Sequence, residues 1–428
     1  MNLTVFFLVT ALTLNHIWRR RNSVQVFLGL AALLALITIL GVPWIGYNHF
    51  DSLEFTKLFN KQMRVPSEDY FPLVVPLVYS FVASIIFFGL RRDDQKITIA
   101  GTSDYLKIRA EAKWSRLISL FILTAYVFPF IGLLFPISLK FVFFLISSIK
   151  YGILLVMLVK ASQNWLKMVI ATFYPISLMV SQGMFQAHLM MMFCLLLVGG
   201  YSISRMKWFI GLIVLIPFLI ILVVSKNSLR SELRNDDLSF SEFASIMQET
   251  LYVRDKGDKG GLAGFTEGQS FELYRRLNQG FMVSAVIERN STSYPLLTEN
   301  IKAILIPRFL WPEKPKAGGQ EKISKFTNLI LTGGTSMNIS PFGEILVQFR
   351  GFEAAIIAFC YGGFLCFGIR SFMYLMLRNK ISILPLPYLL TQIYKIETDM
   401  LTVGNLILKV LVFSWILCWI EKKIKIFN

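Results

Sequence analysis

Long apolar blocks recur along this chain of 428 residues and restrict its fold more than any other feature. A helix of roughly 20 apolar residues is long enough to cross the hydrocarbon core of a bilayer. Blocks of this kind lie near residues 2–18, 24–46, 70–90, 116–136, 140–160, 167–185, 187–204, 207–225, 352–374, 381–396 and 401–420. They predict an all-α integral membrane protein with about eleven transmembrane helices.

The composition excludes an ordinary soluble fold. Hydrophobic residues make up 55% of the chain and charged residues 16%, whereas about a quarter of the residues in a soluble domain are charged. The formal net charge is +17, but the lysines and arginines stand mainly in short gaps between apolar blocks and form no basic stripe with interleaved aromatics. We therefore expect no nucleic acid partner.

The cysteines point to neither a metal nor a disulfide. All four fall inside apolar blocks, at Cys194, Cys360, Cys366 and Cys418. This placement indicates neither a disulfide framework nor a zinc cluster. The sequence therefore predicts no cofactor and no metal site.

Positive charge predicts the orientation of the blocks. One set of short connections is rich in Lys and Arg, with clusters at 19–21, 91–113 and 422–425, and such connections are cytoplasmic. The N-terminus is then outside and the C-terminus inside. The chain divides into an N-terminal transmembrane bundle of about eight spans (1–225), a large extracytoplasmic loop (226–351) and a C-terminal transmembrane segment of about three spans (352–428).

The large loop changes character along its length. Residues 226–270 are rich in Asp, Lys and Gly, which predicts a mobile stretch, and helical periodicity begins at Phe271. Residues 306–315, with the sequence Ile-Pro-Arg-Phe-Leu-Trp-Pro-Glu-Lys-Pro, hold three prolines and form a stiff loop. Its aromatic and charged side chains suit a sugar–phosphate ligand. The alternative is an aromatic and basic belt at the membrane interface.

Two carboxylates stand at the ends of predicted spans. Glu344, in the run Asn-Ile-Ser-Pro-Phe-Gly-Glu (338–344), precedes the span at 352–374. It could act as a general base, or it could be a first-turn acid favoured by the helix dipole. Asp399 ends a run with Lys395 and Glu397, which lies either at the interface or facing a polar cavity.

These motifs resemble the O-antigen polymerases of the Wzy type, the oligosaccharide repeat-unit polymerases of bacterial surface polysaccharide synthesis. The resemblance rests on the order of three elements, namely Arg275-Arg276, the segment 306–315 and Pro341-Phe342-Gly343-Glu344. It implies a glycosyltransferase-C-like architecture in the bacterial inner membrane, with a periplasmic N-terminus and an active site at the outer face. The implied reaction joins undecaprenyl-pyrophosphate-linked oligosaccharides into O-antigen or capsular polysaccharide or exopolysaccharide, without a metal or nucleotide sugar. Membrane lipid and a chain-length-regulating co-polymerase are the other implied partners.

The resemblance also assigns roles to residues. Cations near the leaving pyrophosphate would stabilise its growing charge, and a carboxylate would deprotonate the acceptor hydroxyl. The expected catalytic residues are Glu344, Arg308 and Arg276. The expected substrate-binding residues are Arg275, Lys314, Trp311, Arg230 and Glu313. Glu313 and Asp399 are weaker alternatives for the base, and Arg230 could instead be a solvated surface arginine.

Two other functions fit the same composition. A flippase or transporter of lipid-linked glycans would also be apolar, basic and rich in spans, but it usually shows repeated halves and lacks one dominant outer loop. An O-antigen ligase would share the lipid pyrophosphate donor and the large outer loop. Only the acceptor separates the ligase from the polymerase.

Overall fold

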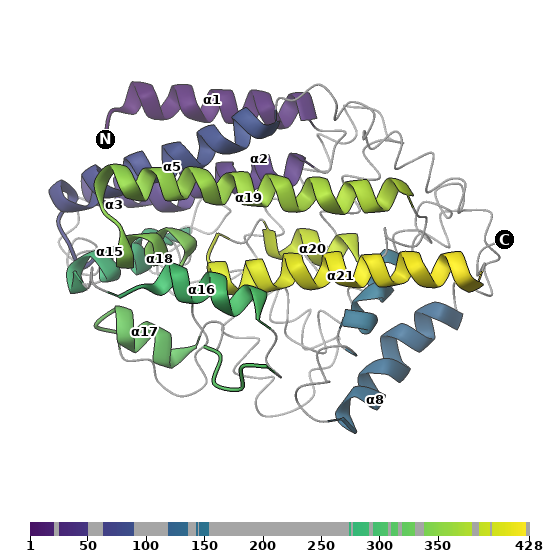
Figure 1. The fold of residues 1–428 in the computed structure, drawn as a ribbon. Coiled ribbons are helices and arrows are strands. Elements are labelled where there is room, and N and C mark those ends of the chain that lie inside the picture. The colour runs from purple at the N-terminus through teal and green to yellow at the C-terminus, as the bar shows by residue number, and fades with distance from the viewer. Residues whose placement is uncertain are drawn as a thin grey trace, which may run out of the picture. The chain divides into compact units, whose positions relative to one another are not determined.

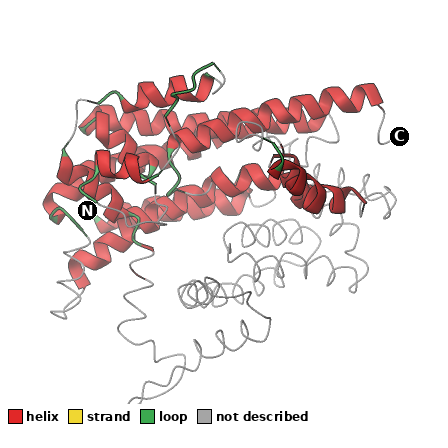
Figure 2. Cartoon of the chain, turned by 90° about the horizontal axis from the view of Figure 1, so that it is seen from below, coloured by secondary structure: helices red, strands yellow, loops and turns green. Residues whose placement is uncertain are grey.

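The computed structural model describes the helices that surround the end of the large loop. Its described residues are 1–20, 25–49, 63–89, 119–135, 143, 145–153, 274, 277–290, 294–306, 310–315, 319–329, 338–378, 385–393 and 396–424. In these ranges every regular element is a helix, as Figures 1 and 2 show. The all-α prediction is confirmed for this part of the chain. The predicted spans at 167–185, 187–204 and 207–225, and the hydrophilic stretch 226–270, lie outside the described residues.

Four described helices are long and apolar enough to cross a membrane. The first is the continuous run of α2 (Val26–Ala35), η1 (Leu36–Gly41) and α3 (Val42–His49). The others are α5 (Ser67–Gly89), α19 (Gly351–Arg378) and α21 (Met400–Ile424). All four coincide with predicted spans, which supports a membrane protein, and the total of eleven stays a prediction.

Shorter helices occupy other predicted spans. The apolar helix α1 (Leu3–Arg20) matches the first block. Within the block at 116–136, η3 (Leu123–Val127) leads into α8 (Phe128–Leu133). In the block at 381–396, the described helix α20 (Leu386–Ile393) has 8 residues, which is too short to cross a bilayer by itself.

Helices α5 and α19 pack along each other and run in the same direction. The rings of Phe81 and Tyr361 stack with centroids 5.9 Å apart, and the Ser84 hydroxyl donates a hydrogen bond of 2.6 Å to the carbonyl of Phe359. A Cβ atom at Gly362 would lie 2.9 Å from the Ser84 hydroxyl oxygen. The missing side chain therefore allows the close approach, as small residues do between membrane helices.

Helix α21 begins beside the middle of α19. Gly368, in the second half of α19, packs against Ile407, which lies two turns into α21. Figure 1 shows that the two helices run in the same direction. The start of α21 is therefore surrounded by protein. Asp399, just before the helix, and Met400, its first residue, are both buried.

Four short helices come from the predicted loop, namely α15 (Gly280–Arg289), α16 (Leu296–Leu305), α17 (Gln320–Phe326) and α18 (Pro341–Gln348). Of these, α15, α16 and α18 pack against the long helices. The ring of Phe342 in α18 lies 5.3 Å from that of Phe81, near the middle of α5. Ile304 of α16 packs against Gly404 of α21. Helices α16 and α18 therefore lie beside the interior of the long helices and not beyond their ends.

Candidate functional site

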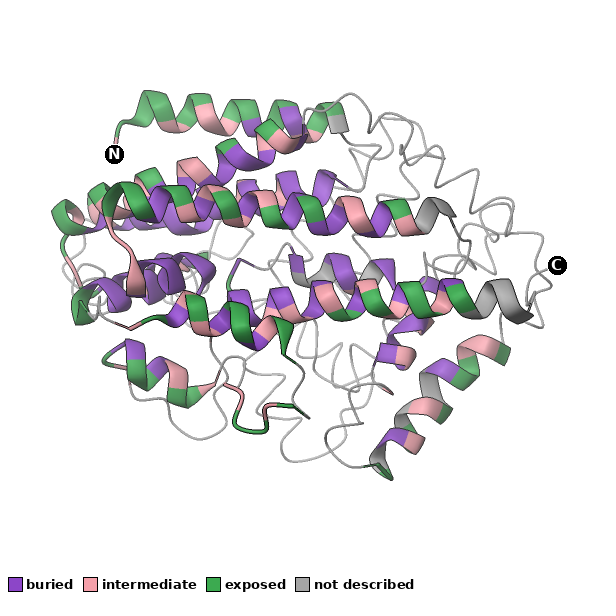
Figure 3. Cartoon of the chain, in the orientation of Figure 1, coloured by how far each residue is buried: buried purple, intermediate pink, exposed green. Residues whose placement is uncertain are grey.

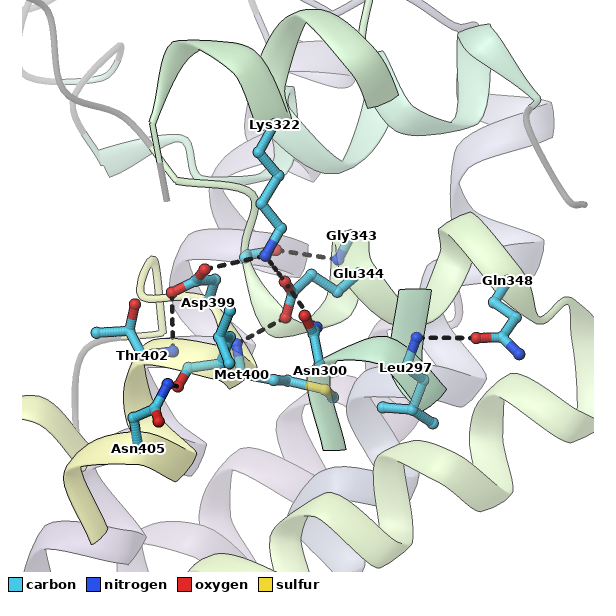
Figure 4. A network of polar contacts seen from close by, with 12 residues as sticks. Leu297, Asn300, Lys322, Gly343, Glu344, Gln348, Asp399, Met400, Thr402 and Asn405 are labelled. Atoms are coloured by element: carbon cyan, nitrogen blue, oxygen red, sulfur yellow. Dashed lines mark hydrogen bonds and ion pairs between the residues drawn. The ribbon is translucent and has the colours of Figure 1, made fainter. Parts of the chain in front are cut away.

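Three charged side chains from distant parts of the sequence meet inside the described helices. Lys322 of α17 forms an ion pair with an oxygen of Glu344 in α18, and its Nζ atom lies 2.9 Å from Oδ2 of Asp399. The side chains of Glu344 and Asp399 are 1% and 0% exposed, and that of Lys322 is 10% exposed. Figure 4 shows Lys322 reaching from α17 to both carboxylates. We call Lys322, Glu344 and Asp399 the ionic cluster.

The local sequence places Glu344 in the first turn of α18. The Ser340 hydroxyl oxygen accepts a hydrogen bond of 3.2 Å from the backbone N–H of Gly343, which caps the helix. Pro341 occupies the start of the helix, where its missing N–H costs nothing. Residues 341–347 are all buried, as expected for a helix surrounded by protein. The first-turn placement is therefore confirmed, and Glu344 is nonetheless a buried member of a charged cluster.

Glu344 is held through both of its carboxylate oxygens. The Asn300 side-chain amide of α16 donates to Oε1 at 3.2 Å, and the backbone N–H of Met400 donates to Oε2 at 2.6 Å. Lys322 also donates to Oε1. Asn300 and Met400 are buried, whereas the side chain of Lys322 is 10% exposed.

Asp399 has a structural contact besides its pair with Lys322. Its Oδ1 atom accepts a hydrogen bond of 3.2 Å from the backbone N–H of Thr402. This is the geometry of an aspartate that caps the N-terminus of a helix. Asp399 thus fixes the start of α21 and holds one side of Lys322.

The cluster contains one cation and two carboxylates, so it carries a net charge of −1 when all three are ionised. Burial raises the pKa of Glu344, the charge of Asp399 adds to this, and Lys322 and the Met400 N–H oppose it. Burial acts to lower the pKa of Lys322, but the two carboxylates outweigh it and leave that pKa raised. Lys322 therefore stays protonated, and Glu344 takes up a proton at a higher pH than an ordinary glutamate does.

The raised pKa of Glu344 predicts how stability depends on pH. At pH values between the ordinary pKa of 4.5 and the raised pKa, the folded protein holds a proton that the unfolded chain has lost. The free energy of unfolding should therefore fall as the pH rises through this window and level off above it. Unfolding in detergent micelles should be measured across the window for the wild type and for Glu344→Gln, whose difference isolates this carboxyl. If both proteins show the same pH dependence, the pKa of Glu344 is not raised.

Besides Glu344, the structure describes three of the predicted site residues, Lys314, Trp311 and Glu313. Lys314 donates to the side-chain oxygen of Asn405 at 3.2 Å and to the carbonyl of Ile306 at 3.1 Å, so it lies beside the first turns of α21. Trp311 is half-buried and Glu313 is exposed, in a turn where the Lys314 N–H bonds the Trp311 carbonyl. Four predicted cations, Arg230, Arg275, Arg276 and Arg308, lie outside the described residues.

Sequence reasoning missed Lys322 and Asn300. Lys322 stands in the polar run Gln320-Glu321-Lys322 and resembles any solvated lysine. The structure fixes it because Ile323 and Phe326 on the same short helix are buried. Arg289 also donates to the carbonyls of Ser324 and Thr327. No signal in a single sequence indicates such a contact.

The described residues give no metal site. In these ranges no three His, Cys, Asp or Glu side chains gather as metal ligands would. The chemistry that the cluster offers is proton uptake by a buried carboxylate beside a lysine cation.

No protein-family model matches the chain, and no curated protein or solved structure matches it either.

Proposed function

We propose that this chain polymerises oligosaccharide repeat units carried on undecaprenyl pyrophosphate, at the outer face of a bacterial inner membrane. One observation carries the proposal. The glutamate that the sequence resemblance selects as a base is buried in a charged cluster among membrane-type helices, with a raised pKa and an adjacent lysine. A base of this kind acts best when its pKa lies near the working pH.

The proposed step transfers a glycan from one lipid carrier to another. A hydroxyl oxygen of the acceptor repeat unit attacks the anomeric carbon of the donor glycan, and Glu344 takes the hydroxyl proton. The bond between the anomeric carbon and the phosphate oxygen breaks. Undecaprenyl pyrophosphate leaves with the electron pair, so the step needs no other reactant.

Cations would stabilise the charge that grows on the leaving pyrophosphate. Lys314 bonds Asn405 in the second turn of α21, and the predicted arginines Arg275, Arg276 and Arg308 would supply further charge. Lys322, besides pairing with Glu344, also supplies a cation in the proposal. Once Glu344 is protonated, only Asp399 still pairs with Lys322 as an anion, and the ammonium is freer to face a phosphate.

A second function is favoured by the same cluster. Ionisable side chains buried among membrane helices also form the proton relays of transporters. A protein that moves lipid-linked glycans across the bilayer could use proton uptake at Glu344 to change conformation. The two functions differ in whether a glycosidic bond is made.

Reconstitution tests the proposal directly. The purified chain is placed in liposomes with an undecaprenyl-pyrophosphate-linked repeat unit, and product length and released lipid pyrophosphate are measured. A ladder of lipid-linked chains, with one pyrophosphate carrier released per added unit, is the expected result. Protein-free liposomes are the control. Movement of the substrate to the opposite leaflet without elongation would instead identify a transporter, and transfer only to an added lipid A core would identify a ligase.

A further inference from the structure

Helix α16 has two different faces, and one of them presents apolar side chains to the surroundings of the protein. On the buried face, Asn300 bonds Glu344 and Ala303 is fully buried. On the other face Ile301 is 50% exposed and Leu305 is 65% exposed. Figure 3 shows this alternation of buried and exposed residues along the helix.

Exposed apolar side chains also follow the end of the helix. Ile306 is 37% exposed, and Leu310 in the following turn is 68% exposed. We call Ile301 and Leu305, which lie on the regular helix, the α16 stripe. They stand one turn apart on the same side of α16, and exposed apolar side chains that gather in this way mark an interaction or membrane surface.

The depth of α16 indicates what covers the stripe. Ile304, next to Leu305, packs against Gly404, which lies inside the candidate span Met400–Trp419. Helix α18, which packs against α16, reaches Phe81 near the middle of α5. Both contacts lie within the length of candidate membrane-spanning helices, so a side of α16 that no protein covers would meet hydrocarbon there.

The exposed residues of neighbouring helices support the same conclusion. The long helix α21 exposes Val412, Trp415 and Trp419, as a helix facing lipid does. In contrast, α17 exposes Glu321, Ser324 and Lys325, which suit water. The exposed side of α16 also carries Thr298 and Lys302, but the two residues of the α16 stripe are apolar like the first set.

We propose that the α16 stripe lies in the bilayer and contacts the acyl chains of membrane lipids. Helix α16 is then a re-entrant helix and not part of a water-exposed loop. Such a helix is compatible with a membrane where its backbone groups are bonded internally and one side is covered by protein. Lys302, also exposed on α16, can extend its long stem so that the ammonium reaches water. The inference does not depend on the proposed enzymatic activity.

The proposal places lipid close to the ionic cluster. Asn300 and Ile301 are neighbours in sequence and point about 100° apart around the axis of α16; Ile301 is exposed and Asn300 bonds Glu344. A lipid chain lying on the stripe would be separated from Glu344 by the thickness of one helix.

Spin labelling distinguishes lipid, water and protein around the stripe. Ile301→Cys and Leu305→Cys are made separately in a chain whose four cysteines are replaced by serine, labelled with a nitroxide and reconstituted in liposomes. Collision rates are then measured with oxygen, which concentrates in hydrocarbon, and with a neutral nickel chelate, which stays in water. Ser324→Cys on α17 is the matched control, because Ser324 is exposed on a helix of polar character.

Each outcome decides the proposal. Frequent oxygen collisions and rare nickel collisions at both stripe positions, with the reverse ratio at Ser324→Cys, are expected. Frequent nickel collisions at the stripe would overturn it in favour of a water-exposed loop. Rare collisions with both reagents would overturn it in favour of a protein partner or a second copy of this chain. Having two labelled positions guards against a single variant that fails to fold.

Discussion

Under the proposed mechanism, Glu344→Gln should lower the rate of chain elongation by about 10²- to 10⁴-fold, the usual contribution of a general base. Glutamine keeps the shape of the side chain and can still accept a hydrogen bond from the Met400 N–H, but it cannot take the proton of an acceptor hydroxyl. The measurement is the initial rate of lipid pyrophosphate release in liposomes with the wild type and the variant.

The matched control for this variant is Glu321→Gln. Glu321 is exposed on α17, next to Lys322 in sequence, and the same change there should leave the rate within about twofold, since surface substitutions are nearly neutral. Full activity of Glu344→Gln would remove Glu344 from the mechanism and leave it a structural role. An inactive variant that also fails to fold would show in its unfolding curve.

Lys322→Met should lower the free energy of unfolding by about 3–5 kcal/mol, because it leaves two buried carboxylates without their cation. Methionine has a similar length and no charge, so the loss measures the ion pairs and not a cavity. The variant and the wild type are compared by chemical denaturation in detergent micelles. The double variant Lys322→Met/Glu344→Gln removes one of the two stranded charges and should regain part of the lost stability.

Lys325→Met on the same helix is the control for Lys322. Lys325 is exposed, and its ammonium lies 3.6 Å from the ring centroid of Tyr294. Such a contact is worth about 0.5–1 kcal/mol at an exposed site. Lys325→Met should therefore lower the free energy of unfolding several times less than Lys322→Met does. Equal losses for the two variants would mean that Lys322 does not neutralise a buried pair of carboxylates.

The sequence predicted the long helices well because hydropathy is a local property. The spans at 24–46, 70–90, 352–374 and 401–420 each coincide with a described helix. The packing of α16 and α18 against these helices was not predicted. It depends on contacts such as Phe342 with Phe81, which join segments far apart in the sequence, and no local pattern records them.

The candidate site shows the same division. The first-turn position of Glu344 could be predicted because it is readable from neighbouring residues. The charged run before α21 was recognised, but the sequence could not separate its members. In the structure Asp399 is buried against Lys322, whereas Glu397 is exposed and bonds Gln279 at 3.4 Å. Asp399 differs from its near neighbour because Lys322 of α17 and Glu344 of α18 make their contacts at the start of α21.

The start of α21 inside the bundle gives the carboxylates a second source of positive charge. The N-terminus of a helix carries the equivalent of about half an elementary charge. At α21 the Met400 N–H points at Glu344 and the Thr402 N–H at Asp399. This dipole is fixed by the backbone, whereas the Lys322 ammonium sits on a flexible side chain. If an arriving phosphate draws Lys322 away, the helix dipole stays and keeps part of the carboxylate charge compensated.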